Sequence, residues 1–306
     1  MNEPLVFLNG QFLPASQAHL NIYDMGVVMG ATFTEMARTF NGQLFRIEEH
    51  LARLNSSLQY GGIELPLSFD SIQKNIHRLV SENLRLLEDG QELALVCFVT
   101  AGENQIYAGR AHGSTPAQPT LCIHSFPIVF RNYQRFYAEG AHVVIPNVRH
   151  IPPQCIDPRT KHRSRLHWFL ADKEVRAKNP HALSLLLDLD GNITESAGAN
   201  FLICKDRTIF CADSRKVLGG ISLQTVQEIA LELDVAWIES DFSVEDVVQA
   251  EEAWLTSTPY CIAPCTRINH QNIGSGKIGP IFREILSAWS EKVGLDIEEQ
   301  ILQASY

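Results

Sequence analysis

The amino-acid sequence predicts an α+β protein of two domains, because strand and helix patterns occur in both halves of the chain without a regular alternation. The chain has 306 residues, a length that fits two domains better than one. Its composition, 45% apolar and 20% charged residues, is that of an ordinary globular protein. We therefore expect two mixed α/β domains rather than one doubly wound sheet.

Tight turns between short apolar runs predict strands in the first third of the chain. Asn9-Gly10 and Asn41-Gly42 each separate two such runs, and Asn-Gly is a strong hairpin signal. Residues 93–100 and 119–126 are expected as buried strands. The stretch between them, residues 102–118, is rich in Gly, Ala, Pro and Ser and is expected to be a mobile loop.

Helical spacing of apolar residues predicts two helices between these strands. The first ends at Gly61-Gly62, and the second follows it. The apolar positions are Ile47, Leu51, Leu54 and Leu58 in the first helix, and Ile72, Ile76, Leu79 and Val80 in the second.

Residues 127–140 are neither periodic nor strongly apolar, and we place an interdomain loop there. The small N-terminal domain then covers residues 1–126 and the larger domain covers residues 141–306. In the larger domain we expect strands at 141–146, 182–189, 200–204, 208–211 and 253–256, and helices at 164–178, 221–233, 244–250 and 280–293.

Charge and composition argue against several classes of protein. A net charge of −10 is unlike that of nucleic-acid-binding domains, which usually have a basic face. No apolar run approaches the ~20 residues that a membrane helix needs, and the N-terminus lacks the pattern of a signal peptide. Seven scattered cysteines are typical of reduced thiols. We expect a cytoplasmic protein that binds neither nucleic acid nor membranes.

Metal and serine-hydrolase chemistry are not supported by the spacing of the residues that they need. His162 and His167 are five positions apart, which is the wrong spacing for one helical face, and Cys261 and Cys265 have no matching pair elsewhere. No Gly-x-Ser-x-Gly motif is present. We therefore expect no metal site.

Lys161 is the first candidate for a catalytic residue. It lies among Arg159, His162, Arg163 and Arg165. Positive neighbours favour a neutral amine, which a lysine needs in order to form an imine with an aldehyde. The alternative interpretation is an ordinary charge in a basic surface loop.

Glu195 is the second candidate, because it is followed by a run of small residues at 196–199 that would let a flat ring approach the backbone. A carboxylate beside a pyridine nitrogen keeps that nitrogen protonated, and the ring then withdraws electrons from a bound substrate. An exposed acid after a turn is the alternative.

An anion site is the third prediction. The segment 219–222 (Gly-Gly-Ile-Ser) opens a predicted helix, where N–H groups favour an anion. The hydroxyls of residues 256–258 could form a second wall, and Arg53 would suit a phosphate if it points into a site. A lysine, an acid and such a helix start can together hold a phosphorylated pyridine aldehyde.

In this order, the segments resemble the class IV, or fold type IV, pyridoxal-phosphate enzymes. That family contains branched-chain and D-amino acid aminotransferases, R-selective amine transaminases and aminodeoxychorismate lyases. The resemblance is carried by residues 195–200, by the Leu-x-Gly-Ile-Ser segment at 218–222 and by Glu-His-x-x-Arg-Leu at 49–54, and it runs from about Leu8 to Gly279.

The resemblance implies two mixed α/β domains, a homodimer and the cofactor pyridoxal 5′-phosphate. Lys161 would form the Schiff base and move the proton, and Glu195 would hold the ring nitrogen. The remaining cofactor contacts that it implies are Arg53, Gly220, Ile221, Ser222, Ser257 and Thr258.

The member of the family is harder to identify, because this chain departs from each pattern. Transaminases commonly have an aromatic residue before the glutamate where this chain has Thr34 and Glu35, and the lyases have threonine where it has Met36. Leu166 replaces the tyrosine of branched-chain enzymes, and Ala101 replaces the arginine of D-amino acid enzymes.

We interpret the chain as a transaminase that moves an amino group between an amino acid, with a branched-chain-like substrate favoured, and a 2-oxo acid through a Schiff base at Lys161. The candidate substrate contacts are Thr34, Glu35, Arg38 and Arg110. The alternatives are an aminodeoxychorismate lyase, an R-selective amine or D-amino acid transaminase, and a drifted binding protein without activity.

Overall fold

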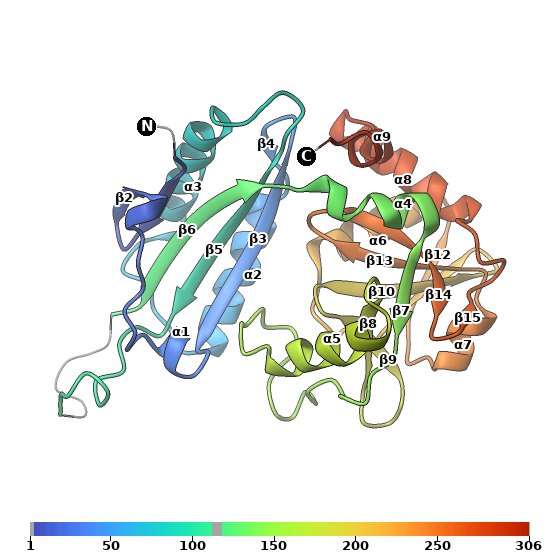
Figure 1. Cartoon of the computed structure of the whole chain (residues 1–306), viewed down its shortest axis with the longest axis horizontal. Coiled ribbons are helices and arrows are strands. Elements are labelled where there is room, and N and C mark those ends of the chain that lie inside the picture. The colour runs from blue at the N-terminus through green and yellow to red at the C-terminus, as the bar shows by residue number, and fades with distance from the viewer. Residues whose placement is uncertain (1–2, 112–117, 306) are drawn as a thin grey trace. The chain divides into compact units, whose positions relative to one another are not determined.

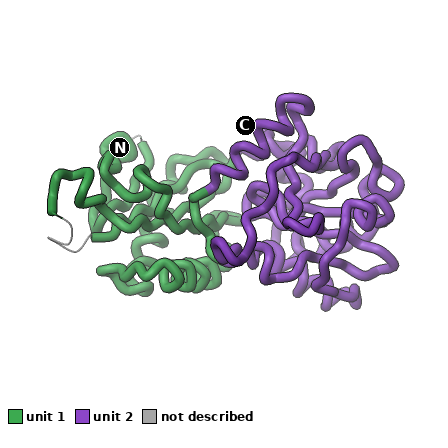
Figure 2. The backbone as a smooth tube through the Cα atoms, turned by 90° about the horizontal axis from the view of Figure 1, so that it is seen from below, with its two compact units in different colours: residues 1–128, 160–164 green, residues 129–159, 165–306 purple. Residues whose placement is uncertain are grey.

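The structure, a computed structural model, describes residues 3–111 and 118–305. The chain forms two compact units (Figure 2). Unit 1 contains residues 1–128 and 160–164, and unit 2 contains residues 129–159 and 165–306. A short segment around Lys161 is thus separated from its sequence neighbours and packs with unit 1.

Unit 1 is built on an antiparallel six-stranded sheet with the strand order β2-β1-β6-β5-β3-β4 (Figure 1). The strands are β1 (Leu5–Leu8), β2 (Gln11–Pro14), β3 (Thr32–Phe40), β4 (Gln43–Leu44), β5 (Leu93–Thr100) and β6 (Thr120–Pro127). The helices are η1 (Ala15–Gln17), α1 (Met25–Val28), α2 (Ile47–Tyr60) and α3 (Phe69–Leu84).

Both Asn-Gly hairpins are confirmed. The backbone is left-handed at Asn9 (φ 49°) and Gly10 (φ 90°), and again at Asn41 (φ 49°) and Gly42 (φ 72°). Positive φ at both central residues is the type I′ geometry, whose twist matches that of the flanking strands.

The two predicted helices of unit 1 are confirmed as α2 and α3, and they cover the same face of the sheet (Figure 1). The residues at helical spacing form the core together with the inward side chains of β5 and β6. Leu54, Ile72, Ile76 and Leu79 are fully buried there. The periodicity predicted these helices correctly because each helix has an apolar face that is buried against the sheet.

Unit 2 contains a mixed nine-stranded sheet. Its strands are β7 (Ala141–Val144), β8 (Leu183–Leu187), β9 (Ile193–Ser196), β10 (Ala199–Lys205), β11 (Thr208–Cys211), β12 (Ala236–Glu239), β13 (Glu252–Ser257), β14 (Cys261–Ile268) and β15 (Gln271–Asn272). Because β9 pairs with both β8 and β10, the strands β10-β13-β14-β7-β8-β9 close into a ring. The mixture of strands and helices in both units agrees with the predicted α+β class.

The helices of unit 2 are η2 (Phe130–Asn132), α4 (Gln134–Glu139), α5 (Leu166–Lys178), α6 (Ile221–Glu232), α7 (Val244–Gln249), α8 (Pro280–Val293) and α9 (Ile297–Leu302). Within the described part of the chain, none of the helices is long and apolar enough to cross a membrane.

The stretch 127–140, expected as a loop, contains η2 and α4. Tyr137 of α4 is buried, and its hydroxyl lies 2.7 Å from the carbonyl oxygens of both Tyr260 and Ile262. Tertiary contacts stabilise this short helix, so the local pattern did not reveal it.

Of the predicted mobile loop at 102–118, residues 112–117 lie outside the described residues. The described part is tied to the start of unit 1, since the amide of Asn104 donates to the carbonyl oxygen of Tyr23 over 2.7 Å.

Candidate active site

Lys161 lies in unit 1, on a short extended segment beside β3. The amide of Thr34 donates to the carbonyl oxygen of Lys161, and the amide of Arg163 donates to the carbonyl oxygen of Thr32, each over 2.9 Å. The amide of Lys161 donates to the hydroxyl of Ser57 on α2, over 3.2 Å. A sheet edge and a helix therefore fix the lysine backbone, which distinguishes it from a solvated surface loop.

The basic residues around Lys161 in the sequence have partners of their own. Arg159 forms an ion pair with Asp157 at 2.6 Å. The guanidinium of Arg163 lies 4.6 Å from the centre of the Phe98 ring. Their positive charges are therefore directed to other groups rather than gathered into one basic cluster.

Glu35 and Arg53 form a buried ion pair in unit 1. Arg53 donates from Nε to Oε1 and from Nη2 to Oε2 of Glu35, each over 2.7 Å. Nδ1 of His50 lies 2.8 Å from Oε2 of the same carboxylate. His50 and Arg53 are three positions apart on α2, so both side chains face β3.

The electrostatics of this group follow from its burial. Burial alone would raise the pKa of Glu35, but the charge and hydrogen bonds of Arg53, with those of His50, lower it to about 2. Burial lowers the pKa of His50, and the positive charges of Arg53 and Lys161 add to that effect against the opposing influence of Glu35. We therefore expect an ionised Glu35 and a neutral His50 near neutral pH.

The other predicted substrate contacts also have partners within unit 1. The hydroxyl of Thr34 donates to the carbonyl oxygen of Cys97 over 3.3 Å. Arg38 is 2% exposed, with its guanidinium 3.9 Å from the centre of the ring of its neighbour Phe40. Arg110 pairs with Glu103 at 2.8 Å.

Glu195 lies in unit 2, on β9, and its carboxylate is held by three donors. Oε1 lies 3.2 Å from Nε2 of His150. Oε2 accepts from Nδ2 of Asn200 over 3.3 Å and from the amide of Leu218 over 3.2 Å. The β9–β10 hairpin pairs Glu195 with Asn200, which places the two side chains on the same face.

His150 and Asn200 were not predicted from the sequence. Asn200 is five residues from Glu195, across the run of small residues at 196–199, so hairpin pairing was a signal that could have identified it. His150 is 45 residues from Glu195 and comes before the predicted helix, so no local pattern links the two.

The start of α6 forms an uncapped helix N-terminus beside Asn200. Gly220 is the N-cap residue, and no side chain caps this helix among the described residues. A Cβ added to Gly220 would lie 2.2 Å from Oδ1 of Asn200. Glycine is therefore required where this chain approaches β10, and the amides of Ile221 and Ser222 follow at the helix start.

In the third segment, residues 256–258, contacts are defined for the hydroxyl of Ser257 and the surroundings of Thr256. Ser257 donates to the carbonyl oxygen of Gly198 over 2.6 Å. Oγ1 of Thr256 is buried and has no hydrogen-bond partner among the described residues. Thr256 pairs with Asn200 across β10 and β13, so its side chain lies on the sheet face that carries Asn200.

The unit 2 residues could bind a ligand that has an anionic group and a hydrogen-bond donor. The uncapped N-terminus of α6 and the hydroxyl of Thr256 suit the anion, and the carboxylate of Glu195 suits the donor. Among the described residues, no group of three or more His, Cys, Asp or Glu side chains could hold a metal ion.

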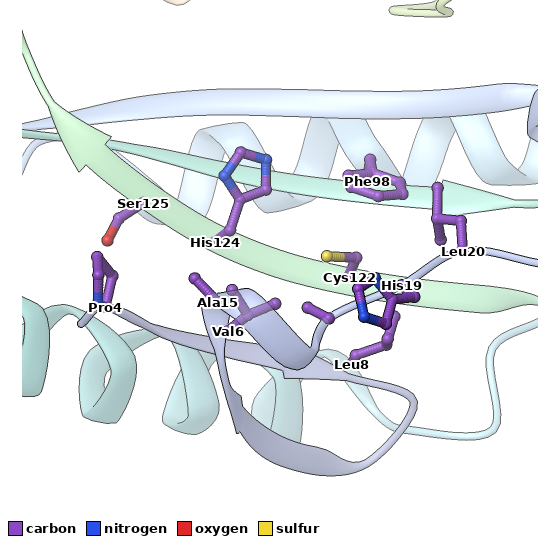
Figure 3. Close-up of a pocket in the computed structure, with 11 residues that line it drawn as sticks. Pro4, Val6, Leu8, Ala15, His19, Leu20, Phe98, Cys122, His124 and Ser125 are labelled. Atoms are coloured by element: carbon purple, nitrogen blue, oxygen red, sulfur yellow. The ribbon is translucent and has the colours of Figure 1, made fainter. Parts of the chain in front are cut away.

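A separate cavity of about 300 Å³ lies on the face of the unit 1 sheet opposite α2 and α3 (Figure 3). Val6, Leu8, Phe98 and Cys122 supply much of its apolar lining, and His124 adds an imidazole. None of the predicted catalytic, cofactor or substrate residues lines this cavity.

Comparisons with known proteins agree with this geometry. The sequence model of the family described as amino-transferase class IV matches residues 32–268. The chain is 27% identical to a D-alanine aminotransferase of Bacillus licheniformis over 290 residues, which cover 94% of this chain and 96% of that protein.

Solved structures show the same fold. The branched-chain amino acid aminotransferase of Escherichia coli superimposes with a TM-score of 0.86 at 21% identity, covering 94% of both chains. The branched-chain aminotransferase of Thermoproteus uzoniensis, solved with norvaline, gives a TM-score of 0.82 at 22% identity, covering 95% of this chain and 94% of that one. The family model matches most of the length of this chain, and the chain therefore belongs to the class IV aminotransferases.

Proposed function

We propose that this aminotransferase uses pyridoxal 5′-phosphate to move an amino group between an amino acid and a 2-oxo acid, with a branched-chain-like amino acid as the favoured substrate. The observation that carries the proposal is the arrangement of Glu195 in unit 2. Its carboxylate is fixed by His150, Asn200 and the amide of Leu218, next to the uncapped start of α6.

The residues of unit 2 fit this cofactor. The orphaned Oγ1 of Thr256 is a buried polar atom without a protein partner among the described residues, and a ligand oxygen would satisfy it. The N-terminus of α6 matches the charge of a phosphate, and Glu195 matches a protonated ring nitrogen. Gly198 has open space where a side chain would lie, so a flat ring has access to the backbone there.

Each residue then has a distinct role in the proposed reaction. When bound, pyridoxal phosphate supplies an aldehyde that condenses with amines and a ring that withdraws electrons. Lys161 would provide the amine that attaches the cofactor, and it would hold and return the proton of the substrate α carbon. Glu195 would keep the ring nitrogen protonated.

The phosphate contacts are proposed for the backbone and hydroxyl donors around α6 and β13. In unit 2 they are Gly220, Ile221, Ser222, Ser257 and Thr258. Arg53 of unit 1 is proposed as a further phosphate contact. Arg53 would approach the phosphate with its orientation already set, because Glu35 holds its Nε and Nη2 atoms. A guanidinium fixed in this way loses little conformational freedom on binding an anion.

For the substrate, Thr34 is the best supported of the four candidates, because its amide is bonded to the carbonyl oxygen of Lys161. Glu35 and Arg38 are buried with partners in unit 1, which supports a role in holding other residues in place. Arg110 is proposed as a substrate contact only if it leaves Glu103.

A substrate panel tests the proposal. The purified enzyme, supplied with pyridoxal phosphate, is incubated with 2-oxoglutarate and separately with L-leucine, L-valine, D-alanine, D-leucine or an R-amine, and glutamate formation is measured. We expect glutamate from the branched-chain L-amino acids. Faster reaction with the D-amino acids would favour the alternative suggested by the D-alanine aminotransferase relative.

Release of pyruvate from aminodeoxychorismate without an amino acceptor would instead indicate a lyase, and no turnover with any donor would contradict the proposal. We further propose that the enzyme is a cytoplasmic homodimer. Light scattering should then give twice the mass of one chain, and a monomer would contradict that part.

A further inference from the structure

The imidazole of His150 faces two groups that can only accept hydrogen bonds. Nδ1 lies 3.1 Å from the carbonyl oxygen of Ile151, and Nε2 lies 3.2 Å from Oε1 of Glu195. A carboxylate oxygen accepts, so a hydrogen bond between Nε2 and Oε1 requires a proton on Nε2.

The surroundings of His150 hold the ring in this orientation. The residue is 7% exposed, and its ring packs edge-on against His167 at 5.9 Å and Trp168 at 5.5 Å between ring centres. Its amide is also fixed, since it donates to the carbonyl oxygen of Leu187 over 2.9 Å. A ring held on three sides cannot turn to exchange its partners without opening the site.

The hydrogen bonds of Glu195 leave His150 as the donor to Oε1. Oε2 already accepts from Asn200 and from the amide of Leu218, while Oε1 has His150 as its one described donor. An ionised carboxylate has about four acceptor positions. One of them therefore remains on Oε1, next to the imidazole.

The charged and titratable groups around His150 come from two elements. Glu195 lies on β9, and the ring of His167 on α5 packs edge-on against that of His150. Arg165, at the start of α5, interacts favourably with Glu195, and its guanidinium donates to the carbonyl oxygen of Ala197. The carboxylate thus has a positive charge nearby even before the imidazole is considered.

We infer that His150 is a positioning residue that donates from Nε2 to Oε1 of Glu195 and turns the remaining acceptor position of Oε1 toward the ring nitrogen of the cofactor. The inference rests on the proposed function for the role of the cofactor, but the hydrogen bond from His150 to Glu195 is a property of the protein alone. Without His150, Glu195 loses its donor on Oε1, and its side chain is less well oriented.

The first experiment uses the cofactor-free protein and does not depend on activity. Nitrogen-15 NMR of the histidine rings, with His150→Gln used to assign the signal, should show a proton on Nε2 of His150. A ring whose only proton lies on Nδ1 would overturn the inference, whatever the enzyme does with pyridoxal phosphate.

The second experiment measures the dissociation constant of pyridoxal phosphate for the wild type and for two variants. His150→Phe fills the space beside Trp168 but has no donor, and we expect about tenfold or more weaker binding. His150→Gln restores a donor toward Glu195 and should recover part of that loss. A ring that only fills space would give the opposite order, with Phe better than Gln, and that result would overturn the inference.

Two controls separate this inference from the proposed function. His181 is exposed in the same unit, so His181→Gln should bind pyridoxal phosphate as the wild type does. With Glu195→Gln as the background, His150→Phe should have little further effect, because the two residues act through one contact. Full additivity of the two losses would contradict the inference. Absence of any binding by the wild type would contradict the proposed function, while the NMR result would still decide whether His150 donates to Glu195.

Discussion

The amide of Thr34 donates a hydrogen bond of 2.9 Å to the carbonyl oxygen of Lys161, so an edge of β3 sets the position of the lysine backbone. The amide of Lys161 is bonded in turn to Ser57 on α2. These contacts use only the backbone of residue 161. The side chain can therefore be changed without removing what holds the segment in place.

Replacing Lys161 with alanine is expected to abolish transamination and leave the fold intact. Loss of the attaching amine and of the proton-carrying group should lower the rate by about a thousandfold or more. The rate of glutamate formation and the thermal unfolding midpoint measure the two effects. Lys173→Ala, a change at an exposed position of α5, should keep the wild-type rate. A Lys161→Ala enzyme with the wild-type rate would contradict the role of Lys161.

The parts of the fold that depend on neighbours in sequence could be predicted. Each Asn-Gly turn is encoded by two adjacent residues that adopt positive φ. The helices α2 and α3 are encoded by regularly spaced apolar residues that form one buried face. Pairing of residues 160–164 with β3 joins segments about 130 residues apart, and no local pattern records it. For that reason Lys161 was expected in the larger domain and lies in unit 1.

The same reasoning applies to the candidate site. Glu195 and the start of α6 were identified because an acid before small residues and a glycine-rich helix start are local signals. His150 lies outside the strands and is held near Glu195 by its backbone bond to Leu187 of β8. The pairing of Glu35 with Arg53 joins a strand to a helix. The burial and the hydrogen-bond partners of such side chains are set by the tertiary structure, so the local sequence does not reveal them.

Gly220→Ala is expected to destabilise the cofactor-free protein by about 1 to 3 kcal/mol, because the new Cβ would overlap Oδ1 of Asn200. The backbone of Gly220 has φ −64° and ψ 136°, so alanine meets no conformational penalty there. Gly219→Ala is the matched control, since nothing lies within 4 Å of its added Cβ. Urea unfolding measures both variants. Equal free energies of unfolding for Gly220→Ala and Gly219→Ala would show that the start of α6 does not pack closely against Asn200 of β10.

Glu35 is expected to make the stability of the protein depend on acid pH. Its pKa is lowered from 4.5 to about 2, so its contribution is complete above pH 4.5 and is lost as the pH falls toward 2. The full effect is on the order of 3 kcal/mol. Glu35→Gln should be less stable at pH 7, because Arg53 then lacks its partner, and the difference from the wild type should shrink as the pH falls.

Urea unfolding at pH 6, 5, 4 and 3.5 measures this difference, and the exposed Glu64→Gln variant serves as the control. A difference between Glu35→Gln and the wild type that stays constant over this range would mean that the pKa of Glu35 is not lowered in the folded state.

Glu252 of β13 is expected to contribute strongly to stability because its carboxylate caps the N-terminus of α8. Its carboxylate accepts from the amides of Ile281 and Phe282 at the start of α8, over 2.9 and 3.0 Å, and from Nε1 of Trp254 over 3.2 Å. The N-cap residue Gly279 has no side chain to do this. Glu252→Ala should therefore cost about 2 to 4 kcal/mol, because buried donors lose a charged acceptor near a helix N-terminus.

Glu252→Gln keeps one acceptor oxygen but places an amide donor against the other contact, so its stability should lie between those of the alanine variant and the wild type. Glu291→Ala is the control, because this exposed acid lies in the last turn of α8, where a negative charge is not stabilising. Urea unfolding of the three variants tests the order. If Glu252→Ala is as stable as Glu291→Ala, the start of α8 does not depend on the carboxylate of β13.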